Sequence, residues 1–274
     1  IQYYCIDHRL LKNINNVQHT SPRTGMFHQV STMTVLRLAA FLATFLSAES
    51  LLHGRHANQP AVRRTSSVAP LPMVASPTGS ENPRRLVSYG MQAFREGKIQ
   101  KSIDLFNQAD EGVPDGSLRP FLWQRGISYY YKDDFSKGSE QFRYDVKVNP
   151  LDVEEIVWDI ACLSRLQPDA VPPPTMMSLP KGKQDRRKIM STVYSLFRGE
   201  ANEHDLAVAG HGGNISDEFY SLYYLGLFCE SRGETAKSAS YMKAAVGTSY
   251  ATGVGAGDYM TSCARVHCEL RGWA

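Results

Sequence analysis

The chain has 274 residues, of which 42% are hydrophobic and 21% charged, and its formal net charge at pH 7 is +3. This length is enough for one or two folded domains with a sizeable core, and a net charge so close to zero gives no reason to expect a nucleic-acid partner. The five cysteines form no Cys-x-x-Cys pair, so they indicate neither a disulfide framework nor a zinc site. We expect buried helix cysteines, no metal and no cofactor.

Residues 1–80 are predicted to be a disordered targeting region outside the fold. Residues 33–50 contain one arginine, then an apolar run and small residues, which is the layout of a secretory signal peptide. The apolar run is shorter than the roughly 20 residues that a membrane span needs, so no transmembrane span is predicted in the mature chain. Residues 51–80 lack acidic residues and are rich in arginine, proline and serine, as in a transit peptide.

A signal followed by a transit segment resembles the two-part address of algal plastids with extra membranes. We therefore expect a plastid (chloroplast) location in an alga or plant. The alternatives are an ordinary secretory signal in front of a disordered tail, import into another organelle, or a wrongly assigned exon.

Residues 81–274 are predicted to form an all-α domain that begins with a helix–turn–helix over residues 83–114. Apolar residues recur at helical spacing on two successive segments. The polar turn between them contains Gly97, which can adopt the positive φ at which helices end.

This pattern occurs twice more, over residues 118–150 and 217–249. Gly126 and Gly226 stand in the two later copies where Gly90 stands in the first. A helix–turn–helix period of about 34 residues is typical of tetratricopeptide (TPR) repeats. The sequence therefore predicts a TPR-type α-solenoid of antiparallel helix pairs.

Small and large residues alternate in a way that predicts how these helices pack. A glycine on the first helix allows its partner to approach closely, and a large residue on the second helix fills the gap between neighbouring repeats. The predicted packing residues are Gly90, Gly126, Gly226, Phe106, Phe142 and Met242.

The helical pattern is irregular over residues 153–210. A helix is predicted from Val153 to Leu166, then a proline-rich loop over 167–182, and then a helix capped by Asp185. At the end of the chain, a terminal helix over 258–272 is predicted to cover the last repeat.

The run from Arg125 to Leu166, RGISYYYKDDFSKGSEQFRYDVKVNPLDVEEIVWDIACLSRL, resembles the corresponding part of bacterial NlpI-type TPR lipoproteins. Their last full repeat is similar to YYLGLFCESRGETAKSASYMKAAV, and plastid TPR proteins of plants and algae have a similar VHCELRGW ending. The resemblance implies an adaptor that holds peptides and partner enzymes and has no catalysis of its own. Unlike the lipoproteins, the chain has no lipobox cysteine after its signal-like segment.

A protein or peptide partner is expected on the concave side, which the first helices of stacked pairs line. The residues predicted to line this groove are Arg84, Met91, Phe94, Arg95, Trp123, Ile127, Tyr130, Tyr131, Tyr223 and Tyr224. Tyr129 is predicted to be the core member of the tyrosine triplet, while Tyr130 and Tyr131 face the groove. The alternative is that the triplet packs against a neighbouring helix or the N-terminal tail.

We therefore expect a non-catalytic TPR adaptor and not an enzyme. One alternative is a small all-α hydrolase with His204 or His211 as its base, for which the sequence offers no nucleophile or metal set. Another is a structural subunit of a membrane-associated assembly.

Overall fold

The structure is a computed structural model, and it describes residues 81–273. Within that range every regular element is a helix and no strand is present. The predicted targeting segments, 33–50 and 51–80, lie outside the described residues. Among the helices described, none combines the length and the apolar character that crossing a bilayer requires.

Three helix pairs lie where the sequence pattern repeats. They are α3 (Pro83–Arg95) with α4 (Ile99–Glu111), α5 (Trp123–Tyr131) with α6 (Phe135–Val148), and α10 (Ile215–Ser231) with α11 (Thr235–Gly247). The turns within the pairs contain Gly97, Asp133 and Gly233, whose φ angles are 68°, 60° and 77°. The three turns therefore share one left-handed residue, which in the second pair is an aspartate without the conformational freedom of glycine.

The same close contact holds each pair together. A Cβ atom on the glycine would meet Phe106 at Gly90 (3.1 Å), Phe142 at Gly126 (2.7 Å) and Met242 at Gly226 (2.8 Å). The six predicted packing residues thus meet in pairs at equivalent positions.

Serine hydroxyls strengthen two of these crossings. Ser102 Oγ donates to the carbonyl oxygen of Gly90, and Ser238 Oγ donates to that of Gly226, both at 2.8 Å. In the middle pair the equivalent position is Gly138, where an added Cβ would meet the sulfur of Cys162 at 2.9 Å and the carbonyl oxygen of Gly126 at 3.4 Å. A small residue is therefore present on the second helix at every crossing.

Three further helices connect the second pair to the third. They are α7 (Val153–Leu166), α8 (Lys188–Phe197) and α9 (Glu203–His211). The structure has no helix over residues 167–187, as the prolines predict. This loop is held on α6 and α8, because Arg143 donates to Thr175 O at 2.7 Å and Leu179 N donates to Tyr194 Oη at 3.0 Å.

Asp185 does not cap α8, so that prediction is wrong. The helix begins at Lys188, and its N-cap residue, Arg187, makes no side-chain cap. Asp185 instead accepts the backbone N–H of Arg187 at 2.8 Å and pairs with the Arg187 guanidinium at 2.9 Å. Because the carboxylate is already bound to the residue before the helix, it is not available to the first turn.

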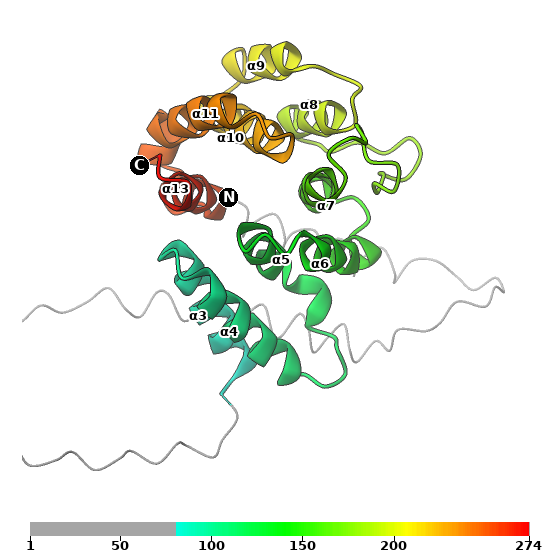
Figure 1. Ribbon diagram of the computed structural model, residues 1–274, viewed down its shortest axis with the longest axis vertical. Coiled ribbons are helices and arrows are strands. Elements are labelled where there is room, and N and C mark those ends of the chain that lie inside the picture. The colour runs from blue at the N-terminus through cyan, green and yellow to red at the C-terminus, as the bar shows by residue number, and fades with distance from the viewer. Residues whose placement is uncertain (1–80, 274) are drawn as a thin grey trace, which may run out of the picture. The chain divides into compact units, whose positions relative to one another are not determined.

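The C-terminal helix α13 (Tyr259–Leu270) begins at the predicted cap, where Asp258 Oδ1 accepts the backbone N–H of Met260 at 2.9 Å. It follows a single turn of helix, α12 (Ser249–Thr252), which the sequence did not predict. Figure 1 shows α13 between α3 and α5 on one side and α10 and α11 on the other. The helix therefore covers more than the last pair, because it also contacts the first two.

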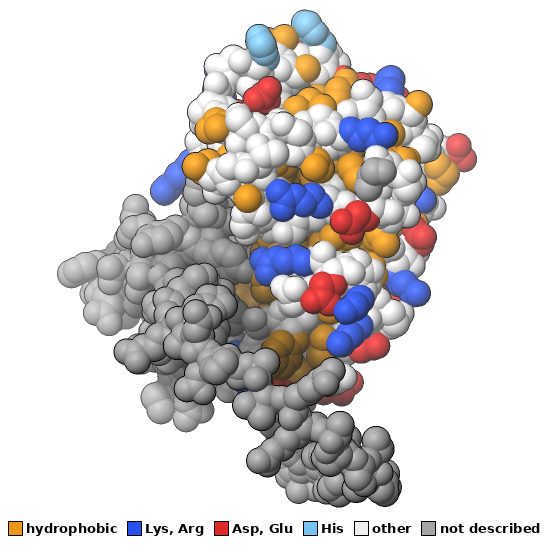
Figure 2. All heavy atoms as spheres, turned by 90° about the vertical axis from the view of Figure 1, so that its left-hand side faces the viewer, with side chains coloured by type: hydrophobic (Ala, Val, Ile, Leu, Met, Phe, Trp, Pro, Cys, Tyr) orange, Lys and Arg blue, Asp and Glu red, His pale blue; other side chains and the backbone are white. Residues whose placement is uncertain are grey.

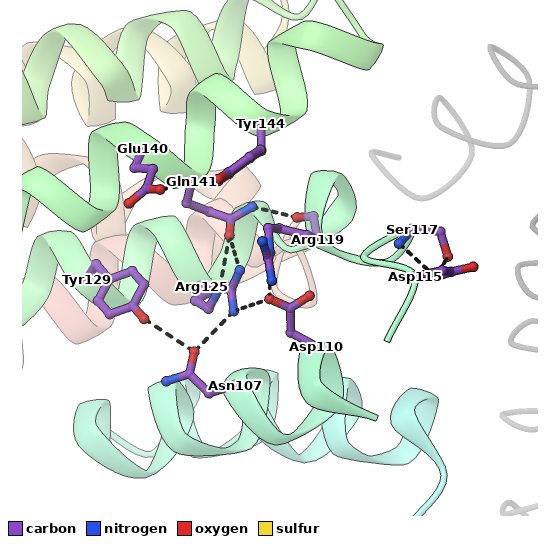
Figure 3. A network of polar contacts seen from close by, with 10 residues as sticks. All are labelled: Asn107, Asp110, Asp115, Ser117, Arg119, Arg125, Tyr129, Glu140, Gln141 and Tyr144. Atoms are coloured by element: carbon purple, nitrogen blue, oxygen red, sulfur yellow. Dashed lines mark hydrogen bonds and ion pairs between the residues drawn. The ribbon is translucent and has the colours of Figure 1, made fainter. Parts of the chain in front are cut away.

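A buried arginine joins the first pair to the second. Arg125 on α5 is 7% exposed and donates to Asp110 at 3.0 Å and Asn107 at 3.1 Å, both on α4. The same guanidinium donates twice to Gln141 Oε1 on α6, and Arg119 forms a second ion pair with Asp110 at 2.9 Å (Figure 3). The planar fork of arginine suits this geometry, in which one side chain fixes three helices.

The glycine contacts lead to a prediction about stability. Gly126→Ala is expected to lower the free energy of unfolding by about 1–3 kcal/mol, because the new methyl group overlaps the Phe142 ring. Gly247→Ala is the matched control, since a Cβ there meets nothing within 4 Å. Urea unfolding of both variants measures the difference, and equal effects at the two sites would contradict the packing described.

Candidate functional site

The surface predicted to be an open groove is covered by α13. Seven of the ten predicted residues are buried, and they are Met91, Phe94, Ile127, Tyr130, Tyr131, Tyr223 and Tyr224. The other three, Arg84, Arg95 and Trp123, are partly exposed. These ten side chains thus belong mainly to a core, which corrects the prediction that they line a groove open to a partner.

Aromatic contacts explain why the groove is filled. The Tyr259 ring of α13 lies 5.4 Å from Phe94 and 5.2 Å from Trp123, measured between ring centroids. Further along α13, the His267 ring lies 5.5 Å from Tyr131. Such contacts stabilise beyond the area they bury, so α13 occupies the position that the sequence left for a partner.

The tyrosine triplet is oriented differently from the prediction. Tyr129 is partly exposed and donates to Asn107 Oδ1 at 3.3 Å, whereas Tyr130 and Tyr131 are 0% and 5% exposed. The prediction that Tyr129 is the core member is therefore wrong. Packing against a neighbouring helix, the alternative, holds for Tyr130 and Tyr131.

The buried tyrosines lead to a carboxylate at the end of α10. Tyr130 Oη donates to Glu230 Oε2 at 3.0 Å, and Arg271 Nε donates to Glu230 Oε1 at 2.6 Å. Tyr131 Oη lies 3.0 Å from His267 Nδ1. Burial lowers the pKa of His267 to about 4, so the ring is neutral at pH 7. Its Nε2 lies 3.6 Å from Glu230, which favours the tautomer with the proton on Nε2.

Glu230 also forms part of the wall of a pocket of about 510 Å³. The pocket lies where the C-terminal ends of α5, α7, α10 and α13 meet the start of α11. The side chains that matter for its chemistry are Asp133, Arg165, Glu230, Arg232, Arg271 and Trp273. This set contains three cations, two anions and one large aromatic ring.

The three arginines of the pocket differ in their partners. Arg271 is neutralised by Glu230 at 2.6 Å and lies 4.0 Å from Asp133. Arg165 and Arg232 form no ion pair with any residue in the range 81–273; their guanidinium groups lie over the rings of Phe135, at 4.8 Å, and Phe228, at 4.1 Å. Stacking of this kind fixes a guanidinium group but leaves its N–H donors unused.

No protein-family model matches this chain. No curated protein and no solved structure matches it either. The resemblance to NlpI-type proteins therefore stays a prediction, and an assignment of function depends on the geometry of residues 81–273.

A second polar cluster contains Glu203, Cys229 and Glu234, whose ligand atoms lie close enough together to hold a metal ion. Lys237 already donates to both carboxylates, at 2.8 Å to Glu203 and 2.6 Å to Glu234. Burial, with a contribution from Glu203, raises the pKa of Cys229 to about 12, which disfavours the thiolate that a metal requires. The ammonium group of Lys237 thus neutralises the two carboxylates in the place of a metal ion.

The alternative of a hydrolase gains no support from its two histidines. His204 and His211 are both exposed on α9, and neither imidazole ring has a hydrogen bond to another residue in the described part of the chain. A general base needs a partner that orients it and a nucleophile within reach. Neither ring has such surroundings.

The charges on the face shown in Figure 2 are mixed. Lys and Arg side chains stand beside Asp and Glu, with hydrophobic atoms between them, and no broad area carries a single sign. Such a face produces no strong directed field. Recognition by charge is therefore better sought in a local feature such as the pocket.

Buried acids gather near the junction of α6 and α7: Asp145 lies on α6, and Glu154 and Glu155 lie in the first turn of α7. Burial raises the pKa of Asp145 to about 8 and that of Glu154 to about 7, in the second case against the effect of Arg187. The pKa of Glu155 is raised well above its usual value by burial and by the nearby Asp152 and Asp145. The folded protein therefore holds protons here that the unfolded chain releases near pH 4.

The covered groove leads to a prediction about stability. Tyr131→Ala is expected to lower the free energy of unfolding by about 3–5 kcal/mol, because the change removes a buried ring from contacts with Phe94 and His267. Tyr89→Ala, on a ring that is 43% exposed, is expected to change it by no more than about 0.5 kcal/mol. Thermal unfolding compares the two variants. An unchanged unfolding free energy for Tyr131→Ala would contradict a buried ring and would support the predicted open groove.

The buried acids lead to a prediction about pH. The raised pKa of Glu155 means that its stabilising contribution is present at low pH and is lost as the pH rises through the folded-state pKa. Glu155→Gln cannot lose a proton, so its unfolding free energy should fall less than that of the natural chain between about pH 6 and about pH 9. Glu140→Gln, at an exposed position of α6, is the control and should leave the pH dependence unchanged. Urea unfolding at both pH values tests this. The same change in unfolding free energy for all three proteins would exclude a buried, protonated Glu155.

Proposed function

We propose that this protein is a non-catalytic adaptor with a TPR-type α-solenoid, which binds a protein or peptide partner in a plastid. The repeated glycine contact and the repeated left-handed turn support the solenoid, because a period of this kind is typical of stacked helix pairs. The plastid location is suggested only by the pattern of residues 33–80.

The partner site that we propose is the pocket at the ends of α5, α7, α10 and α13, and not the covered aromatic surface. The observation that carries this choice is the pair of guanidinium groups, Arg165 and Arg232, which form no ion pair among residues 81–273. Arginine is enriched where proteins bind partners, because its planar fork gives several directed hydrogen bonds. The four tyrosines of the predicted groove are buried, so a partner cannot reach their rings.

Site-directed crosslinking tests this function. Thr235 is exposed and lines the pocket, so a photoreactive phenylalanine analogue at this position should crosslink a partner in the native compartment. The same analogue at Gln100, which is exposed on α4, is the matched control and should not crosslink it.

The crosslink from position 235 should also disappear when Arg165 and Arg232 are both changed to glutamine. Equal crosslinking from both positions, or none from position 235, would contradict a partner site at this pocket.

A further inference from the structure

The pocket of the proposed adaptor has an unbalanced set of charges. Glu230 accepts from Arg271 at 2.6 Å and from Tyr130 at 3.0 Å, so its two oxygens are already used within the protein. Arg165 and Arg232 line the same pocket and have no carboxylate within ion-pair distance in the range 81–273, although Glu234 and Glu203 act on Arg232 from further away. Helix C-termini favour nearby cations, but a helix dipole does not use the in-plane N–H donors of a guanidinium group.

We propose that this pocket binds an acidic peptide segment, with a carboxylate on Arg165 and Arg232 and an apolar side chain against Trp273. The inference rests on the proposed function, because it names the chemistry of the partner at the same site. A carboxylate matches the fork of a guanidinium group in size and geometry and can accept two parallel hydrogen bonds. Charge complementarity of this kind selects an acidic partner over a neutral one and speeds its association.

The exposed acid of the pocket, Asp133, favours a peptide over a phosphate group. Asp133 is 60% exposed at the side chain and lies 4.0 Å from Arg271, so its carboxylate remains accessible at the pocket. It repels a phosphate dianion more strongly than a single carboxylate, and it can accept a backbone N–H, which every peptide supplies. Donors and acceptors in one pocket thus fit an extended chain that carries both.

Trp273 supplies the apolar part of the site. Its ring is partly exposed and lies 5.2 Å from the buried His267 ring, which supports it from behind. Large aromatic rings of this kind are common anchors in peptide recognition, since they offer wide apolar area at low entropic cost. We therefore expect an acidic residue next to an apolar one to bind best.

The test uses fluorescence anisotropy with a labelled peptide of alternating Glu and Leu, and compares it with the same peptide containing Gln for Glu. The full chain should bind the acidic peptide about tenfold or more tightly than the neutral one. The double variant R165Q/R232Q should lose this preference. The double variant K181Q/K183Q removes the same charge from the exposed loop and should retain it.

If R165Q/R232Q does not fold, a second variant that reverses the charge at both arginines provides an independent test. R165E/R232E should prefer a peptide of alternating Lys and Leu, whereas the natural protein should not bind it. A peptide of alternating Glu and Ser should bind the natural protein more weakly than the Glu–Leu peptide, because Trp273 then has no apolar partner.

Equal affinity for the acidic and neutral peptides would overturn the inference. So would displacement of the peptide by inorganic phosphate at a similar concentration, which would identify a simple oxyanion site. A crosslink from Thr235 to a partner without any acidic preference would leave the proposed adaptor function intact and remove only this inference.

Discussion

The packing of α13 against α3, α5 and α11 is the interaction on which the rest of the structure depends. Tyr259 and His267 place rings on α3 and α5, and most of the helix is buried. Without this helix, Phe94, Trp123 and Tyr131 would lose the rings that pack against them, and folded proteins seldom leave a broad apolar patch exposed. In this protein, α13 of the same chain packs on that aromatic surface.

Local features of the fold could be predicted from the sequence because they depend on neighbouring residues. Gly97, Asp133 and Gly233 mark the same turn since the left-handed conformation is favoured by few residue types. α7 has the predicted bounds because Asp152 caps its first turn and its apolar residues follow a helical period. The glycine positions were predictable because each faces a large residue at a fixed distance along the chain.

The covered groove and the pocket could not be predicted, because both depend on contacts between distant parts of the chain. A helical period shows that Tyr130 and Tyr131 share a face, but it does not say whether a partner or α13 lies against it. The pairing of Tyr130 with Glu230 joins residues from two different helix pairs. In the sequence, Arg165 and Arg232 each look like ordinary cations at the end of a helix, and only the structure places them in one pocket.

Arg271 connects the aromatic surface that α13 covers with the charged pocket at the ends of the helices. The residue follows the last turn of the helix, and its guanidinium binds Glu230 only because the helix is docked on its neighbours. That ion pair engages the buried carboxylate of the pocket, whereas Arg165 and Arg232 have no carboxylate within ion-pair distance among residues 81–273. Docking of α13 therefore covers part of the aromatic surface and also fixes one charged wall of the pocket. We therefore propose the ends of the helices, and not the aromatic surface beneath α13, as the place where a partner binds.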